Sequence, residues 1–168
     1  MDGITIKEDS ILHGDAIILA EDPIKEGYSF SGWSKVPEKM PAKDIIISGH
    51  FSIHKYAITY YLDDEIYKID SVEYNSFIKV TNPQKEGYTF SGWGDLPSTM
   101  PANNVVAEGM FHINKYKITY IVEGETLYTD SITFNERISP IDYPEKEGFT
   151  FSGWIGIPTV MPASDVTT

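Results

Sequence analysis

The sequence predicts a mainly β protein made of tandem repeats of about 60 residues, with little helix and an elongated, rod-like arrangement. The segment Lys-Glu-Gly-aromatic-x-Phe-Ser-Gly-Trp occurs three times, ending at Trp33, Trp93 and Trp154. Around each copy, apolar residues alternate with a period of two, which is typical of strands. No window of eleven residues shows a convincing helical period.

Further matches at the same offsets define the units. Pro-x-x-Met-Pro-Ala follows each tryptophan, at 37–42, 97–102 and 158–163, and Lys-Tyr-x-Ile-Thr-Tyr occurs at 55–60 and 115–120. These matches divide the chain into repeat units 1–54, 55–114 and 115–168. In this alignment the first unit lacks its first strand and the third lacks most of its last strand, so that only the middle unit is complete.

The middle unit shows the expected elements in order. Tyr56, Ile58 and Tyr60 share one face of a first strand, and the acidic segment 63–65 predicts a hairpin turn into a second strand that ends near Asn75. A connection containing proline leads to a third strand at 88–93, in which simple alternation places Phe90 and Trp93 on opposite faces. Two prolines then exclude a long helix, and a last strand is expected at 105–113.

The junctions between units predict a break in the strand. Inward-facing apolar residues occupy odd positions from 45 to 53 but even positions from 56 to 60. Because a shift of one residue exchanges the faces of a strand, the chain must bend or bulge near 54/55 and again near 114/115. No Gly/Ser or Pro-rich linker separates the units, so we expect limited motion between them and a semi-rigid rod.

Composition excludes several classes of function. The net charge is −12, spread evenly at −4 in each unit, which disfavours nucleic acid and anionic membrane surfaces as partners. The chain has no cysteine, so disulfides, thiolate zinc sites and cysteine nucleophiles are excluded. It has no apolar run of membrane-spanning length, and its start lacks signal-peptide features, so we expect a mature or excised segment.

The repeated residues resemble a known family. The signature Gly-[Tyr/Phe]-x-Phe-x-Gly-Trp follows Pro-x-Lys-Glu, is preceded by a Tyr-x-Ile-Thr-Tyr strand and is followed by a short β segment. This pattern resembles the Listeria–Bacteroides repeat, the B-repeat of internalin-type bacterial surface proteins. The signature falls on Gly27, Tyr28, Phe30, Gly32, Trp33, Gly87, Tyr88, Phe90, Gly92, Trp93, Gly148, Phe149, Phe151, Gly153 and Trp154. One departure is that Ser34, Gly94 and Ile155 stand where many family copies have tyrosine.

The resemblance implies units similar to the β-grasp fold and a place outside the cell. Family members occur as tandem modules of secreted or wall-attached bacterial proteins. The chain is therefore expected to be an extracellular or wall-attached segment of a larger secreted protein, serving as a stalk or an adhesin.

Several residues could have a functional role, and for each of them a structural role is also possible. The three tryptophans could be sugar-stacking platforms, but a small unit needs such side chains in its core. The histidines His13, His50, His54 and His112 do not recur between units, and on a strand His50 and His54 lie roughly 13 Å apart, too far to share one ion. The acidic segment 63–65 lacks the spacing of a calcium loop, which favours a solvated turn.

The sequence predicts no enzyme. Ser31, Ser91 and Ser152 lack the leading glycine of a nucleophile elbow and have no recurring histidine as a base. No catalytic, cofactor-binding or metal-binding residue is assigned. Two functions stay open, a spacer that holds another domain away from the cell wall and an adhesion module that binds a host protein or glycan. An accessory module of a secreted polysaccharide-degrading enzyme is a third possibility. Open strand edges in the terminal units also predict weak head-to-tail self-association.

Overall fold

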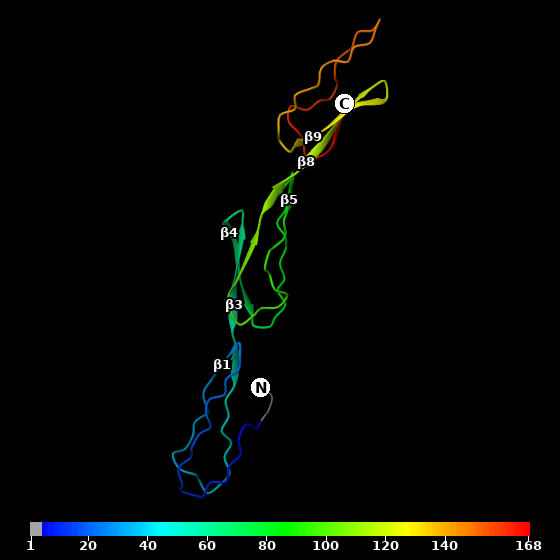
Figure 1. Cartoon of the computed structure of the whole chain (residues 1–168). Coiled ribbons are helices and arrows are strands. Elements are labelled where there is room, and N and C mark those ends of the chain that lie inside the picture. Colours follow the sequence, from blue (N-terminus) through cyan, green and yellow to red (C-terminus); the bar gives the residue numbers. More distant parts are fainter. Residues whose placement is uncertain (1–4) are drawn as a thin grey trace. The chain divides into compact units, whose positions relative to one another are not determined.

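The computed structural model describes residues 5–168, and every regular element within them is a strand (Figure 1). The prediction of a mainly β protein with little helix is confirmed. No helix among these residues is long and apolar enough to cross a membrane. The strands are β1 (Tyr28–Phe30), β2 (Phe51–Ile53), β3 (Lys55–Leu62), β4 (Glu65–Glu73), β5 (Tyr88–Phe90), β6 (Val105–Gly109), β7 (Phe111–Ile113), β8 (Lys115–Val122), β9 (Glu125–Thr133) and β10 (Val166–Thr167).

The strands form two kinds of small sheet. Two three-stranded sheets have the orders β4-β3-β6 and β10-β8-β9, and two ribbons pair β1 with β2 and β5 with β7. β10 runs parallel to β8, and β9 is antiparallel to it, with an irregularity between Tyr120 and Ile121. β6 and β10, which come late in their repeats, therefore lie beside the first strands, β3 and β8. The finer assignment to the β-grasp fold remains a prediction.

The predicted hairpin turn is confirmed. Asp63 and Asp64 connect β3 to β4 with φ of 52° and 66°, and Glu123 and Gly124 connect β8 to β9 with φ of 54° and 86°. Two successive residues with positive φ define the type I′ turn, whose twist matches that of the flanking strands.

The predicted last strand at 105–113 is wrong as a single element. The chain breaks at Met110, because β6 lies beside β3 in the three-stranded sheet whereas β7 pairs with β5. One straight strand cannot serve two separate sheets. The predicted junction breaks, in contrast, are found: β2 ends at Ile53 and β3 begins at Lys55, and β7 and β8 are separated by Asn114 alone.

The predicted strand at 88–93 is also too long. β5 ends at Phe90, and Gly92 has a φ of 88°, a left-handed conformation that turns the chain back. The rings of Phe90 and Trp93 consequently meet edge to face, with centroids 5.0 Å apart. Placing these two side chains on opposite faces was therefore wrong.

The Tyr-x-Ile-Thr-Tyr strands supply the buried side chains. Ile58 and Tyr60 on β3, and Ile118 and Tyr120 on β8, are almost completely buried. In the third repeat Ile118 and Tyr120 pack with Ile138 and with Met161 of the Pro-x-x-Met-Pro-Ala segment. Met100, at the same place in the middle repeat, is buried too.

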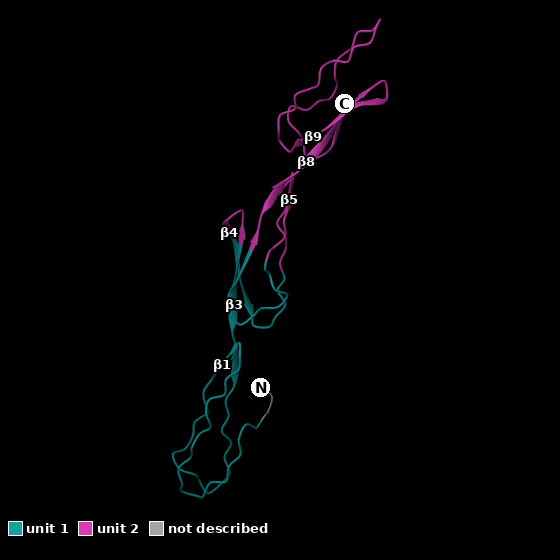
Figure 2. Cartoon of the chain, viewed as in Figure 1, with its two compact units in different colours: residues 1–60, 67–79, 95–107 teal, residues 61–66, 80–94, 108–168 magenta. Residues whose placement is uncertain are grey.

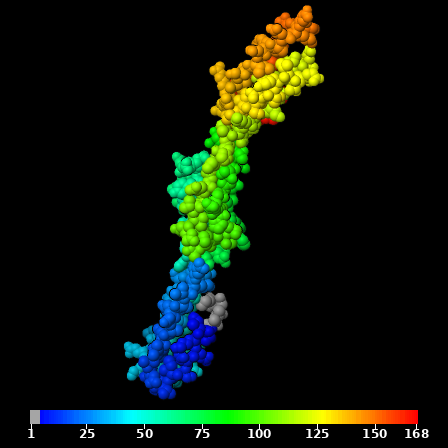
Figure 3. Space-filling view, in the orientation of Figure 1, coloured from blue at the N-terminus to red at the C-terminus, as the bar shows by residue number. Residues whose placement is uncertain are grey.

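The first repeat has no comparable core among its described residues, 5–54 (blue to cyan in Figure 3). No apolar side chain there is fully buried, and Met40, the equivalent of Met161, is half-buried. Ile24 is 99% exposed, and Ile46 is 93% exposed. The reason is that no strand equivalent to β3 is present among the described residues of this repeat, so its apolar side chains have no cover.

The chain divides into two compact units that differ from the sequence repeats (Figure 2). Unit 1 comprises Met1–Tyr60, Tyr67–Lys79 and Asp95–Ala107, and unit 2 comprises Tyr61–Ile66, Val80–Gly94 and Glu108–Thr168. Each unit takes part of the middle repeat and contains one junction between consecutive repeats. The boundaries at 54/55 and 114/115 as limits of folding modules remain a prediction.

Met161→Ala should lower the free energy of unfolding by about 2–5 kcal/mol, because it empties a fully buried position. Met40→Ala, the matched change in the first repeat, should cost clearly less, because that side chain is half-buried. Urea unfolding followed by tryptophan fluorescence measures both. Equal losses would contradict the conclusion that the first repeat lacks a closed core.

The buried tyrosines predict a loss of stability at alkaline pH. Burial raises the pKa of Tyr120 above its ordinary value, and the nearby Asp130 carboxylate acts in the same direction. The fold thus favours the neutral hydroxyl, so its contribution is complete below the ordinary tyrosine pKa of about 10 and is lost as pH rises through the raised value. Tyr120→Phe, which keeps the ring, should show a smaller fall between pH 9 and 11.5 in thermal melts than the parent chain. An identical fall would count against this role of Tyr120.

Candidate functional site

Each junction between consecutive repeats is centred on a glycine beneath an aromatic ring. Gly27 has a φ of 74° and Gly87 a φ of 75°. A Cβ on either glycine would lie 2.2 Å from a ring atom, of Tyr74 in one case and Phe134 in the other. These rings directly follow β4 and β9, so the hairpin of one repeat covers the glycine of the repeat before it. Both the backbone conformation and the close ring require glycine.

Backbone hydrogen bonds connect the same segments. The amide of His54 donates to the carbonyl of Gly27 at 2.8 Å, and the carbonyl of His54 accepts from the amide of Tyr74 at 2.9 Å. Asn114 makes the same two bonds in the second junction, both at 2.9 Å, with Gly87 and Phe134. The residue at the strand break therefore links one repeat to the hairpin of the next.

The side chains of His54 and Asn114 have equivalent structural partners. Asn114 Oδ1 accepts from Thr89 Oγ1 at 2.7 Å, and Asn114 Nδ2 donates to the Tyr116 hydroxyl at 3.4 Å. The His54 ring contacts the Ser29 hydroxyl and lies 3.3 Å from the Tyr56 hydroxyl. Asparagine and histidine thus bridge the same two hydroxyl positions, which gives His54 a structural role.

No group of three or more His, Cys, Asp or Glu side chains that could hold a metal ion occurs among residues 5–168. His50 lies on the surface just before β2. The expectation that the chain binds no metal and no cofactor stays a prediction.

The ribbons complete each junction. In the first, Tyr28 lies opposite Ile53 and Phe30 opposite Phe51, and the β5–β7 ribbon repeats this register with Tyr88 and Ile113. We call β1 and β5 the inner strands of the ribbons and β2 and β7 the outer strands. Gly49 and Gly109 precede the outer strands. A Cβ added to Gly49 would lie 2.4 Å from the ring of Phe30, and one added to Gly109 would lie 2.6 Å from the ring of Phe90, both on inner strands. The outer strand therefore has the pattern Gly-x-Phe-x-Ile.

A lysine covers the aromatic rings of each ribbon. The Lys25 ammonium lies 3.8 Å from the centroid of Tyr28 and 5.8 Å from that of Phe51. Lys85 lies 4.0 Å from Tyr88 and 5.5 Å from Phe111. All four distances are within the range of cation–π attraction, so the lysine of the Lys-Glu-Gly segment holds the two strands of the ribbon together.

The three tryptophans are mostly buried, although none of them is completely enclosed. Each meets the preceding phenylalanine edge to face, with centroid distances between 4.9 and 5.1 Å. The indole nitrogens of Trp33 and Trp154 donate to the carbonyls of Ala20 and Ile141, both at 3.2 Å. These contacts anchor the tryptophans to their own repeats.

Ser31 and Ser91 take part in structural hydrogen bonds. The Ser31 hydroxyl donates to the carbonyl of Gly32 and accepts from the amide of His50, both at 2.9 Å. Ser91 does the same with Gly92 and Met110. These hydroxyls fix the end of each ribbon.

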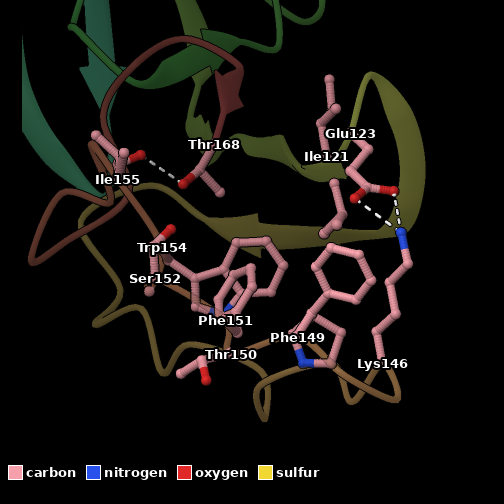
Figure 4. Close-up of a pocket in the computed structure, with 13 residues that line it drawn as sticks. Ile121, Glu123, Lys146, Phe149, Thr150, Phe151, Ser152, Trp154, Ile155 and Thr168 are labelled. Carbon is pink, nitrogen blue, oxygen red and sulfur yellow. Dashed lines mark hydrogen bonds and ion pairs between the residues drawn. The ribbon is translucent and has the colours of Figure 1, made fainter.

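In the third repeat, the segment equivalent to β1 and β5 is residues 149–151, which do not form a strand; their side chains line an open groove (Figure 4). Gly148 keeps the φ of 75°, but an added Cβ there would meet nothing within 4 Å. Phe149 is 68% exposed, whereas Tyr28 and Tyr88 are half-buried. Residues 149–151 pair with no strand in the described part of the chain. An open groove of about 380 Å³ lies beside them, bordered by Glu123, Lys146 and Trp154.

The signature glycines and aromatics were identified from the sequence, but their junction partners were missed. The missed residues are Tyr74, Phe134, His54, Asn114, Gly49 and Gly109. Two sequence signals could have found most of them. An aromatic precedes Asn75 and Asn135 at equivalent positions, and Gly-x-Phe-x-Ile occurs at 49–53 and 109–113.

Comparisons with known proteins agree with this architecture. The family model described as the Listeria-Bacteroides repeat domain matches residues 1–45, 56–104 and 116–167. Internalin H from Listeria monocytogenes is 31% identical over 131 residues, which cover 64% of this chain and 24% of that protein. Two Evansella cellulosilytica proteins whose names describe membrane proteins are 25% and 23% identical, over 90% and 79% of this chain. The matched parts span 20% and 23% of those two proteins.

The junction glycines allow a matched test of the aromatic contact. Gly87→Ala should destabilise the chain by about 2–4 kcal/mol, because left-handed strain adds to the clash with Phe134. Gly148→Ala has the same φ but open space above it, so it should cost only about 1–2 kcal/mol. Denaturant unfolding measures the difference. Equal costs would show that the ring does not press on the glycine.

Proposed function

Because the chain belongs to the Listeria-Bacteroides repeat family, we propose that it is a non-catalytic spacer within a bacterial surface protein. The whole protein's role is part of this proposal, since the matches cover a quarter or less of the relatives' lengths. The similarity to Internalin H and to proteins named as membrane proteins supports a place in the cell envelope, extracellular or attached to the wall.

The junction between repeats is the observation that carries the spacer proposal. Two backbone hydrogen bonds through one residue, together with a ring packed on a glycine, connect each repeat to the next. The connecting segment has no residue free to act as a flexible linker, because β2 and β3 are separated by His54 alone. Such a connection suits a spacer, which must hold the domains at its two ends at a fixed distance.

The distribution of exposed aromatic side chains favours the spacer over the adhesion module. Phe77, an exposed aromatic, is replaced by Arg137 and Ala16 at the equivalent bridge positions of the other repeats. Tyr67 aligns with Leu127, and Tyr143 with Asn82. A repeated glycan or protein contact would need aromatics at the same exposed positions. The tryptophans that do recur are engaged by phenylalanine and, for Trp33 and Trp154, by carbonyl groups.

The remaining expectations fit the same role. The recurring serine hydroxyls of the first two repeats serve structural hydrogen bonds, which supports the absence of catalysis. Uniform negative charge favours solubility and disfavours nucleic acid and anionic lipid. Weak head-to-tail self-association at high concentration stays part of the proposal, supported by the extended edge at residues 149–151, which pairs with no strand of the described chain.

A distance measurement across one junction tests the spacer proposal. Spin labels at Lys43 and Lys79, both exposed and both within unit 1, should give a narrow distance distribution. Tyr74→Ala removes the ring above Gly27 and should broaden it. Phe77→Ala, which removes an exposed aromatic three residues away, is the matched control and should leave it narrow.

A broad distribution in the unmodified chain would contradict the spacer. Saturable binding to a host protein or glycan that survives Tyr74→Ala and is lost on substitution of exposed aromatics would support the adhesion module instead.

A further inference from the structure

We propose that the free edge of β4 pairs antiparallel with the same edge of a second copy of this chain, in a two-fold dimer with Ile69 at its centre. β4 is an outer strand of the sheet β4-β3-β6, and within residues 5–168 it has β3 as its one neighbour. An exposed strand edge is a template for pairing with another chain. This dimer goes beyond the spacer function and does not depend on it.

The free edge presents the backbone groups of Ile69. The amide of Tyr74 donates to the carbonyl of His54 at 2.9 Å. The register of β8 with β9, carried over to β3 and β4 by the repeat, places Thr59 opposite Ile69. Bonded and non-bonded pairs alternate along an antiparallel ladder, and Ile69 lies an odd number of residues before Tyr74. Thr59 and Ile69 are therefore a non-bonded pair, so the amide and the carbonyl of Ile69 point away from β3.

The charges on β4 select one register for the dimer. With Ile69 opposite Ile69 of the second copy, Lys68 lies opposite Asp70 on both sides of the two-fold axis. Sliding one copy by two residues would place either two lysines or two aspartates opposite each other, and like charges directly opposite destabilise a sheet. A slide of one residue would exchange the faces of the strand.

The charged side chains of β4 already lie together. The Lys68 ammonium is 2.8 Å from the Asp70 carboxylate of its own chain, and the two side chains are 50% and 27% exposed. Pairing of two copies would therefore bring four charges of alternating sign together on one face of the combined sheet.

The opposite face of the sheet would gain an apolar contact. The register of β10, β8 and β9, transferred to β6, β3 and β4, sets Val106, Thr59 and Ile69 in one row across the sheet, on the face away from the buried Ile58 and Tyr60. Ile69 is 60% exposed and Val106 is 52% exposed. In the dimer the two rows meet at Ile69, and each isoleucine covers the other from water.

The other repeats lack this combination of residues. In the third repeat Tyr128 replaces the lysine, so a two-fold pairing of β9 would leave Asp130 without an opposite charge. In the first repeat Glu8 replaces the isoleucine and would lie opposite Glu8 of the second copy. The edge of the middle repeat is therefore the self-complementary one. Because each copy has a net charge of −12 and the paired edge is short, the dimer should be weak and form at high concentration.

An exchange of charges tests the register on the intact chain. Lys68→Glu opposes two carboxylates and Asp70→Lys opposes two ammonium groups, so each variant alone should dimerise at least tenfold more weakly than the parent. A mixture of the two variants restores opposite charges at both positions, and the heterodimer should regain the parent affinity within about threefold. Sedimentation equilibrium over a concentration series measures the association, and circular dichroism checks that both variants fold.

A disulfide tests the centre of the dimer and decides if a charge variant fails to fold. The chain has no cysteine, and the Cα atoms of a bonded antiparallel pair lie about 5.5 Å apart, within disulfide range. Ile69→Cys, with oxidised glutathione as the oxidant, should form a covalent dimer. Ser71→Cys is the matched control on the same face of β4. Its two copies would lie about 13 Å apart, so it should crosslink at least tenfold more slowly.

Equal crosslinking rates at positions 69 and 71 would overturn the proposal. A folded mixture that associates no more tightly than the single charge variants would also overturn it, as would a parent chain that stays monomeric at millimolar concentration. Crosslinking of Thr129→Cys as fast as that of Ile69→Cys would show that edge pairing is not specific to the middle repeat, and would overturn the assignment to β4.

Discussion

The architecture depends on one constraint: a single extended segment serves two consecutive repeats. Residues 51–53 pair with β1 of the first repeat, and residues 55–62 form the strand that buries Ile58 and Tyr60 in the next. The inward-facing positions change parity between the two parts, so the segment must break, and His54 is the break. Asn114 does the same at the second junction, with the same two backbone hydrogen bonds.

This sharing explains why the three copies differ in structure although their signatures match. In the second and third repeats the shared segment supplies the buried Ile and Tyr, whereas the first repeat shows no buried apolar side chain among residues 5–54. The third repeat has a buried core around Ile118 and Tyr120, while Phe149 is 68% exposed. The first strand of each shared segment, β2 or β7, thus completes the junction, and the second strand, β3 or β8, supplies the core.

The sequence predicted most of the strands, the hairpin turn and the junction breaks, because period-two alternation and parity are local properties of a strand. Prediction from the sequence failed where contacts between residues far apart in the sequence determine the course of the chain. Gly92 turns the chain so that Trp93 returns to the face of Phe90, and Met110 separates strands that belong to different sheets. The contact between Gly27 and the ring of Tyr74 could not be predicted for the same reason. Alternation shows which face of a strand a residue occupies, but not which residue 47 positions away packs against that residue.

Residue-resolved hydrogen exchange of the native chain tests the shared-segment account most directly. The account predicts that the β3 and β8 amides exchange slowest, that the amides of β2 and β7 are protected as well, and that residues 5–20 and 149–152 exchange much faster than all of these. Equal protection of the three repeats, with residues 149–152 as slow as 88–91, would contradict it.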